Sequence, residues 1–312
     1  MSVKKKIKYY INAAIRRTSW YDQEMFGDCK KFWCQRTFNL DLINLGSGSA
    51  KYGFDYSGIN LKAANWAMAP QTFVGDYVVL SNYLSYLKGD GTVIILTLCP
   101  FTCLDDGKMY LPDKIYTIAD MSSIPDFAIE RKVKAYDLKN NPMRYFPLMR
   151  VLPELKKCLF KTKIHQMDSK ELERNAYYFI ESWMKQFSLN SLSDEFSLVN
   201  KDRFYFSIQA FDRLLALCNN HCYIPVLVLP PVSKYLSRIF DENFQQRFIY
   251  DYLHSSRYPD ITFLNYLGDK EFEDDHLYRN ANFLNPEGAR RFTKRVVNDL
   301  IKKGLLNENK LL

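Results

Sequence analysis

An apolar run that ends abruptly in a glycine- and serine-rich turn is the feature that most constrains the fold of this chain. Residues 38–45 (FNLDLINL) have the composition of a buried strand, and Gly46-Ser47-Gly48-Ser49 follow directly. In α/β proteins, ligands bind beyond the carboxyl ends of parallel strands. We therefore expect residues 38–45 to form a strand of a parallel sheet and the turn to line a binding cleft.

Helical and extended patterns alternate along much of the remaining chain. Periodicity predicts helices over 71–87, 169–187, 206–217, 233–253 and 286–300, and strands over 92–98, 224–229 and 261–266. Asn285 is placed to cap the last helix, with Pro286 in its first position. Strands that alternate with helices indicate a parallel sheet covered on both faces. The predicted fold is a three-layer α/β sandwich of the flavodoxin-like kind.

The stretch from about 105 to 200 is the least regular part of the sequence. Five prolines divide most of it into short helical pieces, and no flexible linker or internal repeat is visible. We interpret it as a helical insertion within one α/β domain that spans residues 38–312. A basic helical segment, residues 1–37, precedes this domain. Residues 1–20 suit either an ordinary docking helix or a helix resting on a membrane surface.

Composition excludes several classes of site. The 312 residues include 43 Lys and Arg against 35 Asp and Glu, a net charge of +8 that permits attraction to phosphates, anionic lipids or acidic sugars. Seven cysteines cannot all pair, and their spacing fits no zinc motif. No phosphate-binding loop, RNA-binding motif, secretory signal or spanning segment is evident. We therefore expect a cytoplasmic protein, free or peripheral to the membrane, with no metal, cofactor or nucleic-acid partner.

Three segments resemble the motifs of a known enzyme family. Residues 42–57 (LINLGSGSAKYGFDYS), 65–71 (NWAMAPQ) and 283–289 (FLNPEGA) occur in this order along the chain. Together they resemble the SGNH hydrolases, and more narrowly a branch among bacterial surface-polysaccharide and D-alanine-transfer proteins. The resemblance implies a three-layer α/β fold with a nucleophilic serine in the first motif. It also implies that an aspartate and a histidine in the last motif activate this serine.

The residues at these three positions depart from the family pattern. Gly48 stands where the serine is expected, Phe283 where the histidine is expected and Asn280 where the aspartate is expected. None of the three can act as nucleophile or general base. We therefore expect a catalytically degenerate protein of bacterial surface-polysaccharide metabolism, which binds a carbohydrate, an acylated sugar or a partner protein. The expected cleft comprises Gly46, Ser47, Gly48, Ser49, Asn65, Asn280 and Phe283.

One alternative retains catalysis. Ser49 or Ser47 would attack an ester, His276 would serve as base, and Asp274 or Glu273 would orient it, as in a carbohydrate O-acetylesterase or O-acetyltransferase. Asn65 and backbone N–H groups of the turn would then stabilise the oxyanion. The competing interpretation is that both serine hydroxyls bond backbone groups within the turn and that His276 is a solvated loop residue.

Overall fold

The computed structural model describes residues 27–33, 37–105, 111–112, 114–125 and 166–307. The chain divides into two compact units, one comprising residues 37–110 and 165–312, the other residues 1–36 and 111–164. The two are described separately. The basic segment 1–20 lies outside the described residues, as does much of the insertion, so the membrane-surface hypothesis for this segment stays a prediction.

The larger unit is built on a five-stranded parallel sheet in the order β2-β1-β3-β4-β5. The strands are β1 (Leu42–Leu45), β2 (Ala63–Asn65), β3 (Val93–Thr97), β4 (Ile224–Leu229) and β5 (Thr262–Asn265). Strands β1 and β3 are buried along their whole length, as their near-continuous apolar sequences require of strands covered on both faces.

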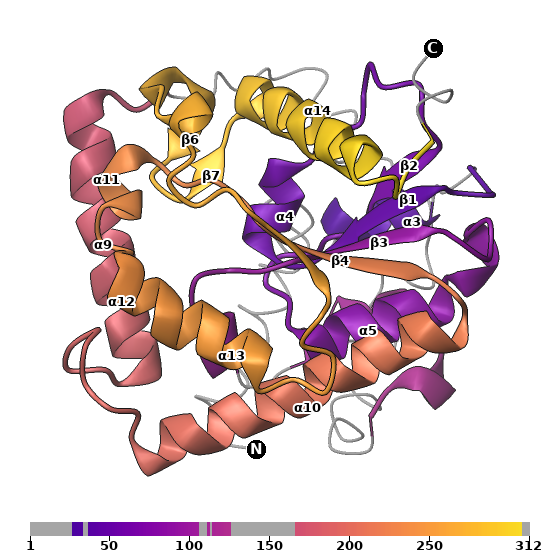
Figure 1. Cartoon of the computed structure of the whole chain (residues 1–312), viewed down its shortest axis with the longest axis horizontal. Coiled ribbons are helices and arrows are strands. Elements are labelled where there is room, and N and C mark those ends of the chain that lie inside the picture. Colours follow the sequence, from indigo (N-terminus) through magenta and orange to yellow (C-terminus); the bar gives the residue numbers. More distant parts are fainter. Residues whose placement is uncertain (1–26, 34–36, 106–110, 113, 126–165, 308–312) are drawn as a thin grey trace, which may run out of the picture. The chain divides into compact units, whose positions relative to one another are not determined.

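Helices cover both faces of the sheet, which confirms the predicted three-layer architecture. Figure 1 shows α14 (Pro286–Lys302) on one side and α5 (Phe73–Asn82) with α10 (Leu198–Asn220) on the other. On the α14 side, alternate strand residues such as Val93 and Ile95 form a core with Phe292 and Val296. The cap of α14 is as predicted, because the Asn285 side chain accepts hydrogen bonds from the backbone N–H groups of Glu287 and Gly288.

Further elements lie beyond the carboxyl ends of the strands. The short helix α4 (Gly48–Gly53) follows β1, and the long helix α9 (Ser169–Phe187) has the predicted bounds and a complete capping box from Asp168 and Glu171. A small antiparallel hairpin, β6 (Tyr278–Asn280) and β7 (Phe283–Leu284), precedes α14. In Figure 1 this hairpin and α4 both lie beyond the ends of the central strands, and β7 contacts α4.

The helix predicted over 233–253 is divided into shorter pieces. They are α11 (Lys234–Ser237), α12 (Glu242–Gln245), a π-helical turn (Gln246–Tyr250) and α13 (Asp251–His254). The division has a local cause, because the side chain of Asp241 accepts a hydrogen bond from the backbone N–H of Phe244 and starts a new helix there. Asp and Asn compete in this way with continuous helical hydrogen bonding.

The smaller unit contains a buried ion pair. The Nζ atom of Lys114 lies 2.7 Å from Oδ2 of Asp28, and the two side chains are only 1% and 4% exposed. Cys29, which lies in the helical turn Gly27–Cys29, donates from its thiol to the carbonyl oxygen of Lys114 at 3.4 Å. The contacts join the N-terminal segment to residues 111–125 within this unit. Along the described parts of the chain, no helix has the length and apolar character needed to cross a membrane.

Candidate functional site

The candidate site lies at the carboxyl end of β1, next to the carboxyl end of β3. In sequence β1 is followed by β2, but in the sheet β1 lies between β2 and β3, so the chain runs outward on one side and returns on the other. Such a topological switch point is where open α/β sheets place their ligands. The residues after β1, beginning at Gly46, and those after β3, including Cys99, therefore meet at the position that the sequence predicted for a cleft.

The turn after β1 depends on glycine at its first position. Gly46 has a φ of +125°, and a Cβ there would lie 3.0 Å from the Cβ atoms of both Ala50 and Thr97. A side chain is thus excluded by backbone conformation and by space. The backbone N–H of Gly46 donates a 3.0 Å hydrogen bond to Oδ1 of Asp76.

Asp76 is a buried carboxyl group directly behind this turn. It projects from α5 and is only 2% exposed. Burial raises the pKa of Asp76 from its ordinary value of 3.8 to about 7, and the hydrogen bond from Gly46 opposes this rise only in part. The side-chain amide of Gln71 lies nearby and also lowers the pKa of Asp76, although neither of its polar atoms forms a hydrogen bond with a described residue. A largely protonated acid therefore supports the turn below neutral pH.

Gly48 and Phe283, which occupy the positions expected for nucleophile and base, are brought into contact. A Cβ placed on Gly48 would lie 2.7 Å from Cζ of Phe283 and 3.0 Å from Cε1. The phenyl ring therefore occupies the volume that any side chain at position 48 would need. Two residues 235 positions apart in the chain thus meet, and neither can act as a nucleophile or a base.

Aromatic and basic side chains surround the ring of Phe283. Its centroid lies 5.2 Å from that of Tyr52 and 6.0 Å from that of Phe179. The guanidinium of Arg279 lies over the Tyr52 ring at 4.2 Å, and Nζ of Lys51 lies 5.3 Å from its centroid. Tyr52, Arg279 and Lys51 are partly exposed. We call these three residues the Tyr52 patch.

The two serines beside Gly48 are both engaged. The Ser47 hydroxyl accepts a 3.2 Å hydrogen bond from the backbone N–H of Gln71, so it holds the turn to the following segment without capping α4. Ser49 is buried, and its hydroxyl accepts from the Cys99 thiol at 3.5 Å. Burial raises the pKa of Cys99 to about 11, which keeps this thiol protonated.

Asn65 and Asn280 serve local backbone groups. The side-chain amide of Asn65 donates to the carbonyl oxygens of Ala50 and Phe54, which end α4, and its Oδ1 accepts from Ala67 N–H. Its N–H groups are thus already used, and an oxyanion would have to compete for them. Oδ1 of Asn280 accepts from the backbone N–H groups of Asn282 and Phe283, which shapes the hairpin.

His276 and Asp274 lie on the surface before this hairpin. Both are exposed, and Oδ1 of Asp274 accepts from the backbone N–H of His276 and not from its imidazole. Among the described residues, no hydrogen bond links the His276 side chain with Ser47 or Ser49. The neighbouring acid Asp275 has a separate role, because it accepts from the hydroxyl groups of Ser169 and Tyr235.

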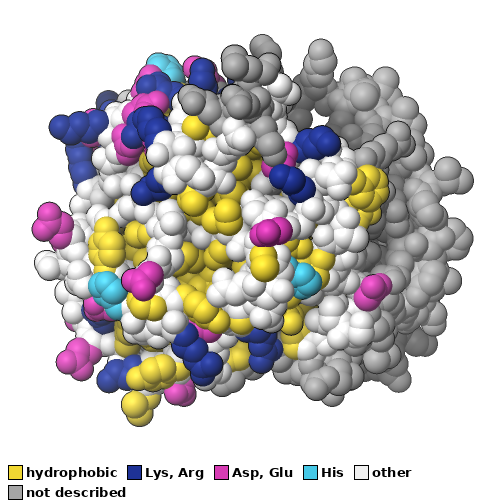
Figure 2. Space-filling view, turned by 45° about the vertical axis from the view of Figure 1, so that its right-hand side comes forward, with side chains coloured by type: hydrophobic (Ala, Val, Ile, Leu, Met, Phe, Trp, Pro, Cys, Tyr) yellow, Lys and Arg dark blue, Asp and Glu magenta, His cyan; other side chains and the backbone are white. Residues whose placement is uncertain are grey.

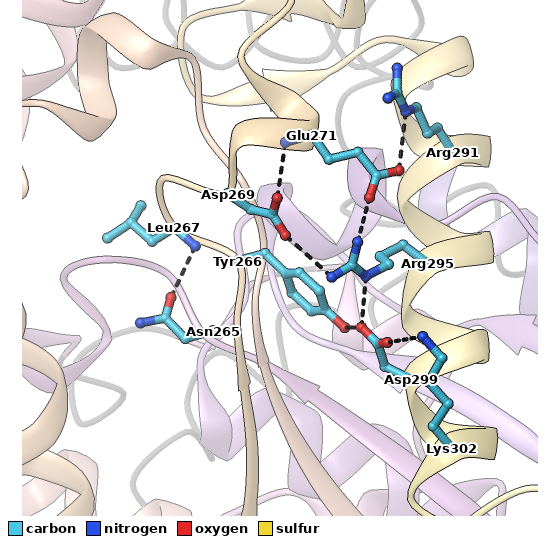
Figure 3. A network of polar contacts seen from close by, with 9 residues as sticks. All are labelled: Asn265, Tyr266, Leu267, Asp269, Glu271, Arg291, Arg295, Asp299 and Lys302. Atoms are coloured by element: carbon cyan, nitrogen blue, oxygen red, sulfur yellow. Dashed lines mark hydrogen bonds and ion pairs between the residues drawn. The ribbon is translucent and has the colours of Figure 1, made fainter.

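An ion-pair network fixes the last helix against the end of β5. Arg295 on α14 bonds Asp299 and Glu271, and Tyr266 donates to Asp299 at 2.9 Å (Figure 3). Burial alone would raise the pKa of Asp299, but the bonds from Arg295 and Tyr266 outweigh it and lower the pKa. These acids are thus paired, and the described residues contain no cluster of His, Cys, Asp and Glu that could hold a metal ion. The network orients α14, whose first turn follows the hairpin that carries Phe283.

Charged side chains are not concentrated in one area of the face shown in Figure 2. In Figure 2, hydrophobic side chains occupy much of the middle of the visible face, and Lys, Arg, Asp and Glu are interspersed around them. The basic side chains of the described residues therefore do not form a single positively charged area on this face. The chain matches no protein-family model and no curated protein.

Proposed function

We propose that this chain is a catalytically degenerate SGNH-type protein of bacterial surface-polysaccharide metabolism, which binds an acidic carbohydrate at the Tyr52 patch without cleaving an ester. The observation that carries the proposal is the contact between Gly48 and Phe283. A serine hydrolase needs a hydroxyl and an imidazole within hydrogen-bond reach of each other. Here the two facing positions hold a hydrogen atom and a phenyl ring.

The Tyr52 patch supplies groups suited to a sugar acid. A tyrosine ring offers an apolar face and a polar edge, and the planar guanidinium of Arg279 matches the geometry of a carboxylate. Lys51 adds a second positive charge. The patch adjoins Phe283 and therefore lies at the switch point, where this fold class binds ligands.

An active O-acetylesterase or O-acetyltransferase remains the alternative. It requires one of the two serines to become a nucleophile, with His276 as its base. The hydroxyl of Ser49 is buried against Cys99, that of Ser47 accepts from a backbone N–H, and His276 is exposed. No contact among these residues favours the alternative.

Fluorophosphonate labelling separates the two functions. We expect intact-mass spectrometry of the folded protein to show no adduct while an active serine hydrolase in parallel is labelled. A single adduct on Ser47 or Ser49 that disappears on heat denaturation would instead establish the enzyme, and Ser49→Ala and Ser47→Ala would then identify the nucleophile.

Carbohydrate binding is tested by calorimetric titration with oligogalacturonate, an acidic probe, and with a neutral malto-oligosaccharide of the same length. We expect oligogalacturonate to bind more tightly, and Arg279→Gln to weaken it about tenfold because a charge-assisted bond is lost. Arg290→Gln, which removes an exposed charge on α14, is the matched control and should have little effect. Equal affinity for both sugars, or none for either, would refute an acidic-carbohydrate site at this patch.

The contact between positions 48 and 283 predicts an energetic coupling. Gly48→Ser should lower the free energy of unfolding by about 1–3 kcal/mol, because the new side chain overlaps the Phe283 ring. In a Phe283→Ala background this cost should largely disappear, which a denaturant-unfolding cycle of four proteins measures. Gly53→Ser is the control on the same helix, since a Cβ there meets Phe292 only at 3.8 Å. Additive effects of the Gly48 and Phe283 substitutions would contradict the contact.

A further inference from the structure

A cavity of about 580 Å³ lies away from the switch point, between the start of α10 and the π-helical turn. Its volume falls within the range of roughly 300–1,000 Å³ that is usual for small-molecule sites. It shares no lining residue with the site around Gly48. The walls combine aromatic and charged side chains, mainly Glu195, Phe196, Lys201, Phe204, Tyr205 and Arg247.

Arg247 is a partly buried cation in this wall without a carboxylate partner among the described residues. Its Nη1 donates to the carbonyl oxygen of Leu192 at 3.2 Å, while its Nη2 is buried without a hydrogen-bond partner in that part of the chain. The guanidinium lies 4.3 Å from the centroid of Phe196 and 5.4 Å from that of Phe248. An unpaired charge in such surroundings is unfavourable, and an anionic ligand would offset this cost.

The backbone that carries Arg247 is itself unusual. Residues Gln246–Tyr250 form a π-helical turn between α12 and α13. A π-turn inserts one residue into a helix and changes the direction of the side chains, and such turns occur often at functional sites. This observation is independent of the cavity and of the charge, and it concerns the same residue.

The aromatic walls are supported from behind. Phe248 stacks on Phe244 with ring centroids 4.4 Å apart and meets Phe101 edge-on at 5.3 Å. Phe204 contacts Tyr252 edge-on at 5.5 Å. Rings held by such contacts keep their orientation, so the cavity is formed before a ligand arrives.

The balance of charge selects the kind of ligand. Arg247 and Lys201 have no ion-pair partner among the described residues. Of the acids in the wall, Asp251 already accepts a 2.8 Å hydrogen bond from Gln246, and Glu195 is exposed. Arg247 is therefore the most enclosed of the charged groups in the wall, and its charge is positive. The geometry points to a second ligand site, in which the rings of Phe204 and Tyr205 bind a planar aromatic acid and Arg247, with Lys201, binds its carboxylate.

Three probes of one shape and different charge test this site. They are 2-naphthoate, its uncharged amide and 2-naphthylmethylammonium, with binding followed by saturation-transfer NMR and titration calorimetry. We expect naphthoate to bind at least tenfold more tightly than the amide, because only naphthoate can form charge-assisted bonds with Arg247. The ammonium probe should bind least.

Variants assign the binding to these residues. Arg247→Gln should reduce the affinity for naphthoate to that for the amide, and Lys201→Gln, at an exposed position, should reduce it several-fold without disturbing the fold. Arg257→Gln is the control, because Arg257 is 86% exposed and outside the cavity wall. Equal affinities for naphthoate and its amide, tighter binding of the ammonium probe, or unchanged affinity in both Arg247→Gln and Lys201→Gln would overturn the proposal.

Discussion

The Asp76→Asn variant is expected to be more stable than the original protein at pH 8, by up to about 4 kcal/mol, and to lose this advantage at pH 4. The reason is the buried carboxyl group, whose pKa rises from 3.8 in the unfolded chain to about 7 in the folded protein. A difference of about three pKa units corresponds to about 4 kcal/mol. The folded state holds the proton more tightly, so the stability contributed by Asp76 is complete below pH 3.8. It is lost as pH rises through about 7.

The measurement is the free energy of unfolding by denaturant at several pH values from 4 to 8. Asparagine keeps an oxygen that can accept from Gly46 N–H but carries no charge to bury. Asp202→Asn, at an exposed position on α10, controls for the general effect of removing an acid. A stability difference between Asp76→Asn and the original protein that stayed constant with pH would show that Asp76 titrates normally.

Replacing Lys114 with Met is expected to destabilise the smaller unit by roughly 3–5 kcal/mol. The substitution removes the ammonium group that lies 2.7 Å from the buried carboxylate of Asp28 and leaves that charge in an enclosed position. Hydrogen exchange of residues 27–33 and 114–119, together with denaturant unfolding, would report the loss. We expect faster exchange in these segments and little change in β3 and β4 of the larger unit.

The double variant Asp28→Leu with Lys114→Met is the informative comparison. With both charged groups removed, neither buried ion is left without the other, and most of the lost stability should return. Lys88→Met removes a lysine that is 55% exposed and lies 3.8 Å from the largely buried Asp41. It should cost less than Lys114→Met, because a long ion pair with one solvent-exposed partner contributes about 0–1 kcal/mol. If Lys114→Met cost no more than Lys88→Met, the pair between Asp28 and Lys114 would not be a buried one.

The sequence predicted those parts of the fold whose signals are local and strong. The buried strand 224–229 and the helix 169–187 have the predicted bounds, and Asn285 caps α14 as expected. The sequence does not predict strand β2, because three partly buried residues carry too short a pattern. Helix α10 begins eight residues before the predicted helix 206–217, since the exposed Leu198 and Val199 do not show helical periodicity.

Prediction of the site depended on whether its residues carried a motif. Gly48 and Phe283 were identified from two distant segments, and the structure brings them together. The sequence offered no sign that Asn65 ends α4 or that Asp76 is buried behind Gly46, because both depend on contacts between separate elements. Arg247 lay inside an apparently continuous helix, and the π-turn that changes its surroundings has no recognisable sequence pattern.

The packing of Phe283 against Gly48 also restricts the order in which this protein can change during evolution. A side chain at position 48 overlaps the ring, so a substitution there lowers stability unless residue 283 first becomes smaller. The intermediate would contain a cavity and be less stable. Introducing a serine at position 48 and a histidine at position 283 therefore requires two substitutions, and we expect either one alone to lower stability. The residue that either position can accept therefore depends on the residue at the other.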